Sequence, residues 1–213
     1  MNSIFWLTDN THIADIGPVS GNDDAAASSL LYKSAGSETD GSEKLIALYE
    51  KKKAGSEKLP LPGMVSVLLK KELERVKKVL ETWKEVDERV SQLCPTSSAE
   101  QDKSTGNACT DKITDGLVGF LSGNLSGDTW RDEYLGVNAT VTGGVETGNG
   151  VKFTGRGAGA EWPVGKQGEN QLYHFANYNF TLVATVSIHN VPEGGSIPLI
   201  GVKMNDGGEN TVV

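Results

Sequence analysis

The stretch Lys70–Leu93 reads KKELERVKKVLETWKEVDERVSQL, and its periodicity differs from that of the sequence on either side. Apolar residues recur three, four or seven positions apart at Leu73, Val76, Leu80, Trp83, Val90 and Leu93. Such spacing places the apolar side chains in one stripe along an amphipathic helix, opposite a charged face. The helix is expected to be about 35 Å long, at a rise of ~1.5 Å per residue. Its charged face and its position predict a rigid connector, and barely three heptads disfavour a coiled coil.

Both flanks of this helix carry short apolar runs separated by turn residues, which is a β pattern. Before the helix the runs are IFWL, SSLLY, KLIALYE and MVSVLL. After it they are GLVGFLSG, LGVNATVTG, GVKFTG, AEWPV, FTLVATVSIH and IPLIGVKM, with the spacing of a sandwich or jelly roll. The prediction is a mainly β protein with one connecting helix, and four segments: 1–69 β, 70–93 helix, 94–114 polar linker, and 115–213 β.

Charge and hydropathy exclude several classes of partner. The chain of 213 residues has a formal net charge of -8, which disfavours non-specific binding to nucleic acid and to anionic membranes. No apolar run approaches the roughly 20 residues of a membrane span, so direct membrane insertion is not expected. The first residues lack the features of a signal peptide, and both ends interrupt strand patterns. The chain is therefore expected to be part of a longer product.

The cysteine and histidine residues do not form a metal or triad pattern. Cys94 and Cys109 lie in a polar loop without a nearby histidine or CxxC spacing, which speaks against a zinc or redox site. They form either a disulfide, which needs an oxidising compartment, or two unpaired thiols. His12, His174 and His189 show no ligand spacing, so structural or surface roles are expected. No metal and no cofactor are predicted.

Three triplets match the acceptor pattern for N-glycosylation, at Asn124, Asn138 and Asn179. Such triplets also arise by chance in a chain with this content of Asn, Ser and Thr. Their clustering after the helix favours an extracellular β-rich protein. The residues alone reveal no active site.

Five segments together resemble the trypanosomal trans-sialidase superfamily: WLTDNTHIADIGPVSGNDDAAASSLLYK, KLIALYEKKK, LERVKKVLETWKEVDERVSQLC, ITDGLVGFLSG and WPVGKQGENQLYHFANYNFTLVATVSIH. The resemblance implies that residues 1–69 are the end of a six-bladed sialidase β-propeller and that the helix is the interdomain connector. It also implies that residues 115–213 are the first part of a concanavalin A-like lectin domain, a jelly roll. The Cys94–Cys109 pair fits a linker disulfide of the family.

The resemblance also assigns a role to the stretch Ala25–Tyr32, AAASSLLY. Active family members carry the similar pattern D-D-N-S-A-Y-S-S-V-L-Y, and aligning Ser28, Ser29 and Tyr32 places Ala27 where the catalytic tyrosine stands. The anomeric carbon of sialic acid bears a carboxylate, so these enzymes use a neutral tyrosine, activated by a glutamate, as the nucleophile. The methyl group of an alanine cannot act as the nucleophile. Tyr32 matches a second tyrosine of the family, which is not catalytic.

Glu50 matches a family glutamate that braces one arginine of the triad holding the sialate carboxylate. The alternative is an ordinary glutamate at the end of a strand. The arginines themselves are missing before the helix, because the four arginines of the chain are Arg75, Arg89, Arg131 and Arg156. No catalytic residue is therefore predicted in these 213 residues.

The resemblance implies a non-catalytic surface glycoprotein that acts in host-cell adhesion or is exposed as an antigen, and that contributes to virulence. Its expected partners are glycoconjugates or proteins of the host-cell surface. Its expected location is extracellular, at the cell surface and held by a lipid anchor, with the signal peptide and anchor signal outside these residues. The alternatives are an active sialidase or trans-sialidase, and a carbohydrate-binding lectin-like module.

Overall fold

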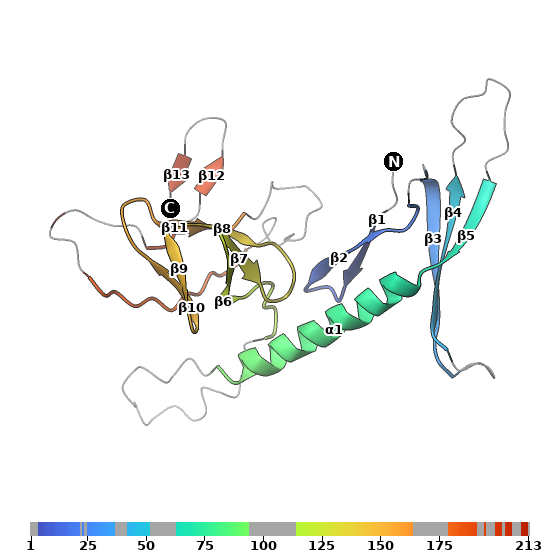
Figure 1. The fold of residues 1–213 in the computed structure, drawn as a ribbon, viewed down its shortest axis with the longest axis horizontal. Helices are drawn as coiled ribbons and strands as arrows, with labels where there is room; N and C mark the ends of the chain where they lie inside the picture. The colour runs from blue at the N-terminus through green and yellow to red at the C-terminus, as the bar shows by residue number, and fades with distance from the viewer. Residues whose placement is uncertain are drawn as a thin grey trace, which may run out of the picture. The chain divides into compact units, whose positions relative to one another are not determined.

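The structure is a computed structural model that describes residues 4–21, 23, 25–36, 42–51, 63–93, 114–163, 179–190, 194, 199–201, 203–205 and 210–212. Its secondary structure is mainly β with one helix, as predicted. Figure 1 labels the elements along the chain. The chain divides into two compact units, residues 1–179 and 180–213, which are described separately. Cys94, Cys109 and His174 lie outside the described residues.

The segment before the helix forms two antiparallel sheets. Their five strands are β1 (Ile4–Thr8), β2 (Ile13–Pro18), β3 (Ala25–Lys33), β4 (Lys44–Lys51) and β5 (Gly63–Leu68). β1 pairs with β2, and β3, β4 and β5 pair in that order. The four apolar runs that the sequence carries before the helix form β1, β3, β4 and β5. β2 was not among the predicted runs.

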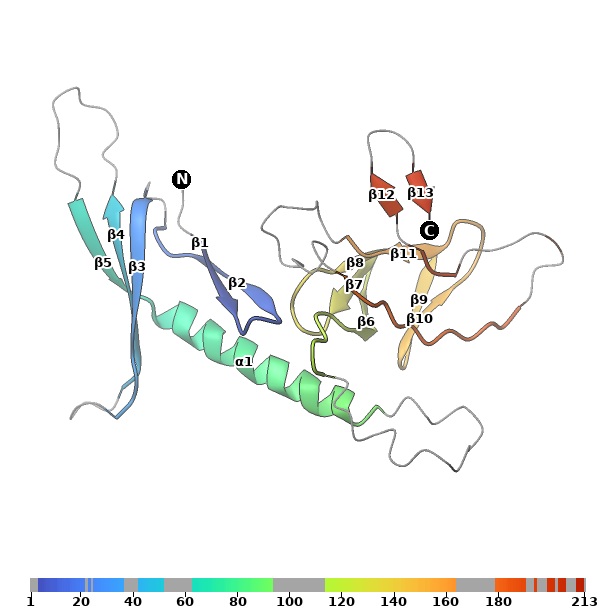
Figure 2. The same cartoon turned by 180° about the vertical axis from the view of Figure 1, so that it is seen from behind.

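The predicted helix is present as α1 (Lys70–Ser91), two residues shorter at its end than expected. Glu72 lies in its first turn and Arg89 in its last, so both charges complement the helix dipole. The β1–β2 hairpin lies alongside α1 in both views (Figures 1 and 2). The helix is therefore packed against β structure and is not a free linker.

The buried face of α1 differs from the predicted stripe. Its buried residues are Val79, Trp83, Val86 and Val90. Val76 and Leu73 are half-buried against the two cores, as predicted. Leu80 and Leu93 are 46% and 50% exposed, so their assignment to the stripe was wrong. Val76, Val79, Trp83, Val86 and Val90 alternate steps of three and four, which keeps them on one side of a helix with 3.6 residues per turn.

The segment after the helix forms a second β region. Its strands are β6 (Leu121–Ser126), β7 (Thr129–Asp132), β8 (Ala139–Thr142), β9 (Gly144–Thr147), β10 (Gly150–Phe153) and β11 (Gly159–Glu161). One sheet has the order β11-β8-β7-β6, and β9 pairs with β10 in a hairpin. A side chain at Gly144 would clash with Val141 Cγ1, so close packing between β8 and β9 requires glycine there.

Residues 180–213 contain one described hairpin, in which β12 (Lys203–Asn205) pairs with β13 (Asn210–Val212). The run FTLVATVSIH was predicted to be a strand, but residues 179–190 form none in the structure. Val183 and Ile188 in this run are 85% and 63% exposed. Among the described residues no strand pairs with this run, and strand composition alone does not make a strand without such a neighbour.

Two hydrophobic cores in the described part of residues 1–179 contact α1 at different positions along its length. The larger core joins β2, α1 and the segment that follows β7 through Ala14, Ile16, Val79, Trp83, Val86, Val90 and Tyr134. The smaller core lies at the start of α1 and contains Val19, Leu45, Ala47 and Leu69. The helix thus contacts both β regions through one buried face, which is how a connector becomes rigid.

Candidate functional site

The structure places Ala27 opposite Glu50 on neighbouring strands, although 23 positions separate them in the sequence. Ala25 pairs with Lys51 and Ser28 pairs with Tyr49, so residues 26 and 27 of β3 share the one position opposite Glu50 of β4. This is the two-against-one arrangement of a β-bulge, a feature that often lies beside active sites and redirects a side chain. Ala27 is exposed and Glu50 is half-buried.

A hydrogen-bonded cluster fixes the chain next to the bulge. Tyr49 is 3% exposed and its hydroxyl donates to Asp23 Oδ2 at 2.9 Å. Lys51 Nζ lies 2.6 Å from Asp23 Oδ1. The backbone N–H of Asp23 also donates to the carbonyl of Ser20 at 2.9 Å. The turn that precedes β3 is therefore held to the end of β4, and this positions the bulge.

The charges of this cluster are stable at neutral pH. The Lys51 ammonium and then the Tyr49 hydroxyl hold the pKa of Asp23 below its usual range. Burial, followed by the hydrogen bond to Asp23, raises the pKa of Tyr49. The hydrogen bond to the Asp23 carboxylate raises the pKa of Lys51. The phenol thus stays protonated and donates to a carboxylate, so Tyr49 is a structural group and not an activated nucleophile.

The described residues of β3 and the four arginines of the chain can now be placed relative to the bulge. Ala27 ends in a methyl group, and the hydroxyl of Tyr32, farther along β3, donates to Glu43 Oε1 at 3.1 Å. The arginines lie elsewhere: Arg75 and Arg89 in α1, Arg131 in β7, and Arg156 between β10 and β11.

Two further classes of site are not supported in the part of the chain that the structure describes. Among those residues no group of three or more His, Cys, Asp and Glu side chains is placed to hold a metal ion. No helix among them is long and apolar enough to cross a membrane.

All three candidate glycan acceptors are exposed. Asn124 lies in β6, Asn138 precedes β8, and Asn179 ends the first unit. Asn138 already has a structural contact, because its Oδ1 accepts the backbone N–H of Asp132 at 3.0 Å. Their use as acceptors remains a prediction.

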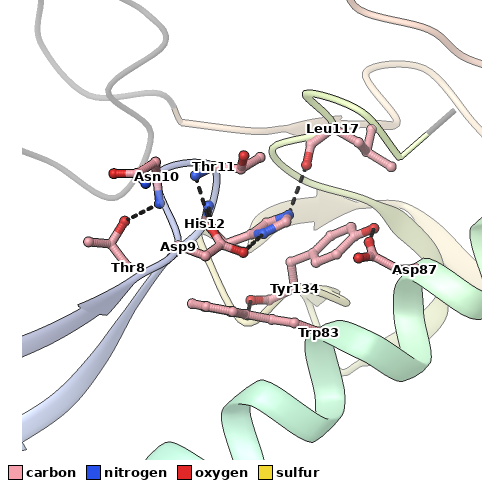
Figure 3. Close-up of polar contacts among 9 residues, drawn as sticks. All are labelled: Thr8, Asp9, Asn10, Thr11, His12, Trp83, Asp87, Leu117 and Tyr134. Carbon is pink, nitrogen blue, oxygen red and sulfur yellow. Dashed lines mark hydrogen bonds and ion pairs between the residues drawn. The ribbon is translucent and has the colours of Figure 1, made fainter. Parts of the chain in front are cut away.

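A buried polar junction, which sequence reasoning missed, lies where the β1–β2 turn, α1 and residues 117–134 meet (Figure 3). His12 is 5% exposed and stacks on Tyr134 with ring centroids 4.1 Å apart. Trp83 Nε1 donates to the Tyr134 carbonyl at 2.7 Å, and the Tyr134 hydroxyl donates to Asp87 Oδ1 at 2.7 Å. The available signal was Trp83 on the apolar stripe, because a buried indole N–H needs an acceptor.

Comparison with known proteins finds a matching family model for each of the two β regions. Residues 113–213 match the family described as trans-sialidase, C-terminal domain, and residues 2–50 match a BNR repeat-like domain. A sialidase of Trypanosoma cruzi is 34% identical over 206 residues, which cover 95% of this chain. The chain belongs to the trypanosomal trans-sialidase superfamily. A second T. cruzi relative of this superfamily chain, sialidase 85-1.1, is 32% identical over 208 residues.

Solved structures agree with this membership of the trans-sialidase superfamily. Trypanosoma rangeli sialidase in complex with the inhibitor DANA has 38% sequence identity and a TM-score of 0.78, over 99% of this chain. The same enzyme in complex with sialic acid has 37% identity and a TM-score of 0.64, over 83% of the chain.

The chain spans only part of these relatives. It covers 16% of the length of the first T. cruzi sialidase and 23% of sialidase 85-1.1. It covers 31% of the T. rangeli chain that carries DANA. The activities named for these proteins belong to much longer trans-sialidase superfamily chains.

Proposed function

We propose that this chain belongs to a non-catalytic surface protein of the trans-sialidase superfamily, which binds glycoconjugates or proteins of a host cell. The observation that supports this proposal most directly is the position of Ala27 in the β-bulge opposite Glu50. By resemblance, this is the position of the tyrosine that attacks sialic acid. The proposal includes the finer architecture: the end of a six-bladed propeller, the connector α1 and part of a concanavalin A-like sandwich.

The chemistry at this position separates binding from catalysis. A retaining glycosidase needs an oxygen nucleophile that forms and then releases a covalent glycosyl intermediate. The Ala27 methyl has no lone pair and cannot attack an anomeric carbon. The Asp23–Tyr49–Lys51 cluster fixes the chain beside the bulge. A sialidase-like scaffold that lacks the tyrosine nucleophile is what we expect of a binding protein in this superfamily.

The sialidase names of the relatives favour one alternative, an active enzyme. The test is hydrolysis of a fluorogenic sialoside by the purified chain, with T. rangeli sialidase as the positive control. We expect no release of the fluorophore above the buffer rate. Release above that rate, abolished by a sialidase inhibitor such as DANA, would establish the enzyme and reject the non-catalytic proposal.

The binding half of the proposal needs a separate measurement. The chain is displayed on beads and added to host cells, before and after the cells are treated with an active sialidase or a protease. Binding that falls after either treatment identifies a glycan or a protein as the partner. Binding equal to that of beads carrying unfolded chain would reject the adhesion role and leave only the superfamily assignment.

A further inference from the structure

His12 is held between two hydrogen-bond acceptors from distant parts of the sequence. Its Nδ1 lies 3.0 Å from Asp9 Oδ2, within the β1–β2 turn. Its Nε2 lies 2.8 Å from the carbonyl oxygen of Leu117, which is 105 positions away. Figure 3 shows the ring lying between these two partners. The imidazole therefore connects the β1–β2 hairpin to the segment that leads into β6.

Counting protons at this ring gives its charge. A carbonyl oxygen only accepts hydrogen bonds, and an ionised carboxylate also only accepts. Both ring nitrogens must then carry a proton for both contacts to be hydrogen bonds, which makes the ring an imidazolium. A neutral ring would face one of the two acceptors with a lone pair.

Asp9 is ionised in this arrangement, which excludes the alternative of a protonated carboxyl. Burial opposes its ionisation, but the hydrogen bonds from the His12 ring and from the backbone of His12 and Thr11 outweigh burial and lower the pKa of Asp9. The two backbone N–H groups donate to Oδ1 at 2.6 and 2.9 Å. Oδ2 is left for the His12 ring.

The surroundings of the ring also favour a positive charge. The ring stacks on Tyr134 with an interplanar angle of 14°, and the Trp83 ring centroid is 5.2 Å away. Aromatic faces at such distances attract cations. The charged groups nearest to the junction are Asp9 in the turn, Asp87 of α1 at the Tyr134 hydroxyl, the buried Asp132, and the Arg89–Glu133 ion pair. Only one of these groups is a cation.

We propose that His12 is a protonation-dependent latch. Its Nε2–H holds the β1–β2 turn to the carbonyl oxygen of Leu117, its Nδ1–H anchors the ring to Asp9, and loss of one of these protons loosens the contact between the turn and residues 117–120. The stabilisation is present while both ring nitrogens carry a proton and is lost when one of the protons leaves. At the acid end, Asp9 sets a second limit, because its stabilising contribution is lost as the pH falls below the usual aspartate range. The junction is thus tightest while His12 carries both ring protons and Asp9 is ionised.

The proton count can be measured directly by NMR correlation of the imidazole nitrogens in the folded chain. At pH 5.5 we expect both His12 nitrogens to carry protons that exchange slowly with water, whereas those of the exposed His189 exchange rapidly. A His12 ring with a single protonated nitrogen at pH 5.5 would overturn the proposal.

The latch itself is tested by hydrogen exchange of the Leu117 and Phe120 amides at pH 5.5 and 8.5, corrected for base catalysis. We expect their protection to fall about tenfold more than that of the β4 amides, the loss expected for a hydrogen bond to a charged group. Equal changes in both sets of amides would contradict the latch.

Asp9→Asn provides the matched control. The asparagine oxygen keeps the contacts of Oδ1 with the backbone of Thr11 and His12. Its NH₂ group replaces Oδ2 and donates to Nδ1, so a neutral ring satisfies both partners. We expect the excess loss of protection between pH 5.5 and 8.5 to disappear in this variant. The same tenfold loss in Asp9→Asn would show that another group controls the junction.

Discussion

At the scale of single residues, Ala27 and the buried polar junction differ in how much the local sequence indicates about their roles. Ala27 was identified because a nearby pattern, Ser28-Ser29 and Tyr32, aligns with a family motif. His12 and Tyr134 were not identified as a pair, because 122 positions separate them and nothing local to either marks the other as a partner. Contacts of this range depend on how α1 orients its two neighbours, and a single sequence does not contain that orientation.

Tyr134 offers a test of the junction at this scale. It is 1% exposed, and burial, followed by the hydrogen bond to Asp87, raises the pKa of its phenol. The phenol therefore remains a donor to Asp87 throughout the physiological range. We expect Tyr134→Phe to lower the free energy of unfolding by roughly 1–2 kcal/mol, measured by urea denaturation, because it leaves the Asp87 carboxylate without this donor.

Tyr32→Phe is the matched control for that change. Tyr32 is 53% exposed and its hydroxyl donates to Glu43 at 3.1 Å. Removal of an exposed hydroxyl of this kind should change the free energy of unfolding by less than about 0.5 kcal/mol. Equal effects of the two substitutions would mean that the junction hydrogen bond contributes nothing specific.

At the scale of elements, the sequence predicted the helix and four of the five described strands before it, but it assigned two exposed residues, Leu80 and Leu93, to the buried face of the helix. The existence of α1 follows from its periodicity, and its start at Lys70 matches the prediction. Val79 and Leu80 are adjacent and both apolar, so the local pattern does not decide which of them is buried. The partner surface decides it, because Ala14, Ile16 and Tyr134 meet the side of the helix that carries Val79.

Trp83 is the largest of the buried side chains of α1. It is 3% exposed and its indole N–H donates to Tyr134. We expect Trp83→Ala to destabilise the chain by about 3–5 kcal/mol in urea denaturation, because it removes a large buried side chain and leaves a cavity. Limited proteolysis near α1 should accelerate in parallel.

Leu80→Ala is the matched control, because it shortens an apolar side chain of the same helix that is not buried. Leu80 lies in the same helix and is 46% exposed, so its truncation should cost less than about 1 kcal/mol. A cost for Leu80→Ala that equals the cost for Trp83→Ala would contradict the assigned buried face.

At the scale of the whole molecule, α1 joins two β regions that would each have a small core. The chain before α1 buries residues such as Ala47 and Leu45, and the junction core adds contacts across the helix. The predicted mainly β structure and the position of the helix were confirmed. In residues 179–190, by contrast, the amino-acid composition predicted a strand that the structure does not contain. Their run is strongly apolar, but the described residues include no strand that pairs with it.

The linker after α1 supplies a prediction at this scale. Cys94 and Cys109 are expected to form a disulfide when the chain is made in a secretory pathway. The bond would close a loop of about 15 residues and contribute about 3 kcal/mol in the simplest entropic account. Mass spectrometry of secreted protein, digested without reduction, should recover the linked peptides. Recovery of two alkylatable thiols would refute the pairing.

The most direct test of the central claim, that Ala27 occupies the nucleophile position of a sialidase scaffold, is a chimera. The segment of T. rangeli sialidase that aligns with residues 25–51 is replaced by this chain's β3, loop and β4, and hydrolysis of a fluorogenic sialoside is measured. We expect kcat at least about a thousandfold below the parent enzyme, the usual scale for a lost nucleophile. Ala27→Tyr in the same chimera should recover most of that loss, with both proteins melting within a few degrees of each other. An Ala27 chimera with activity near that of the parent, or a folded Ala27→Tyr chimera without recovery, would contradict the claim.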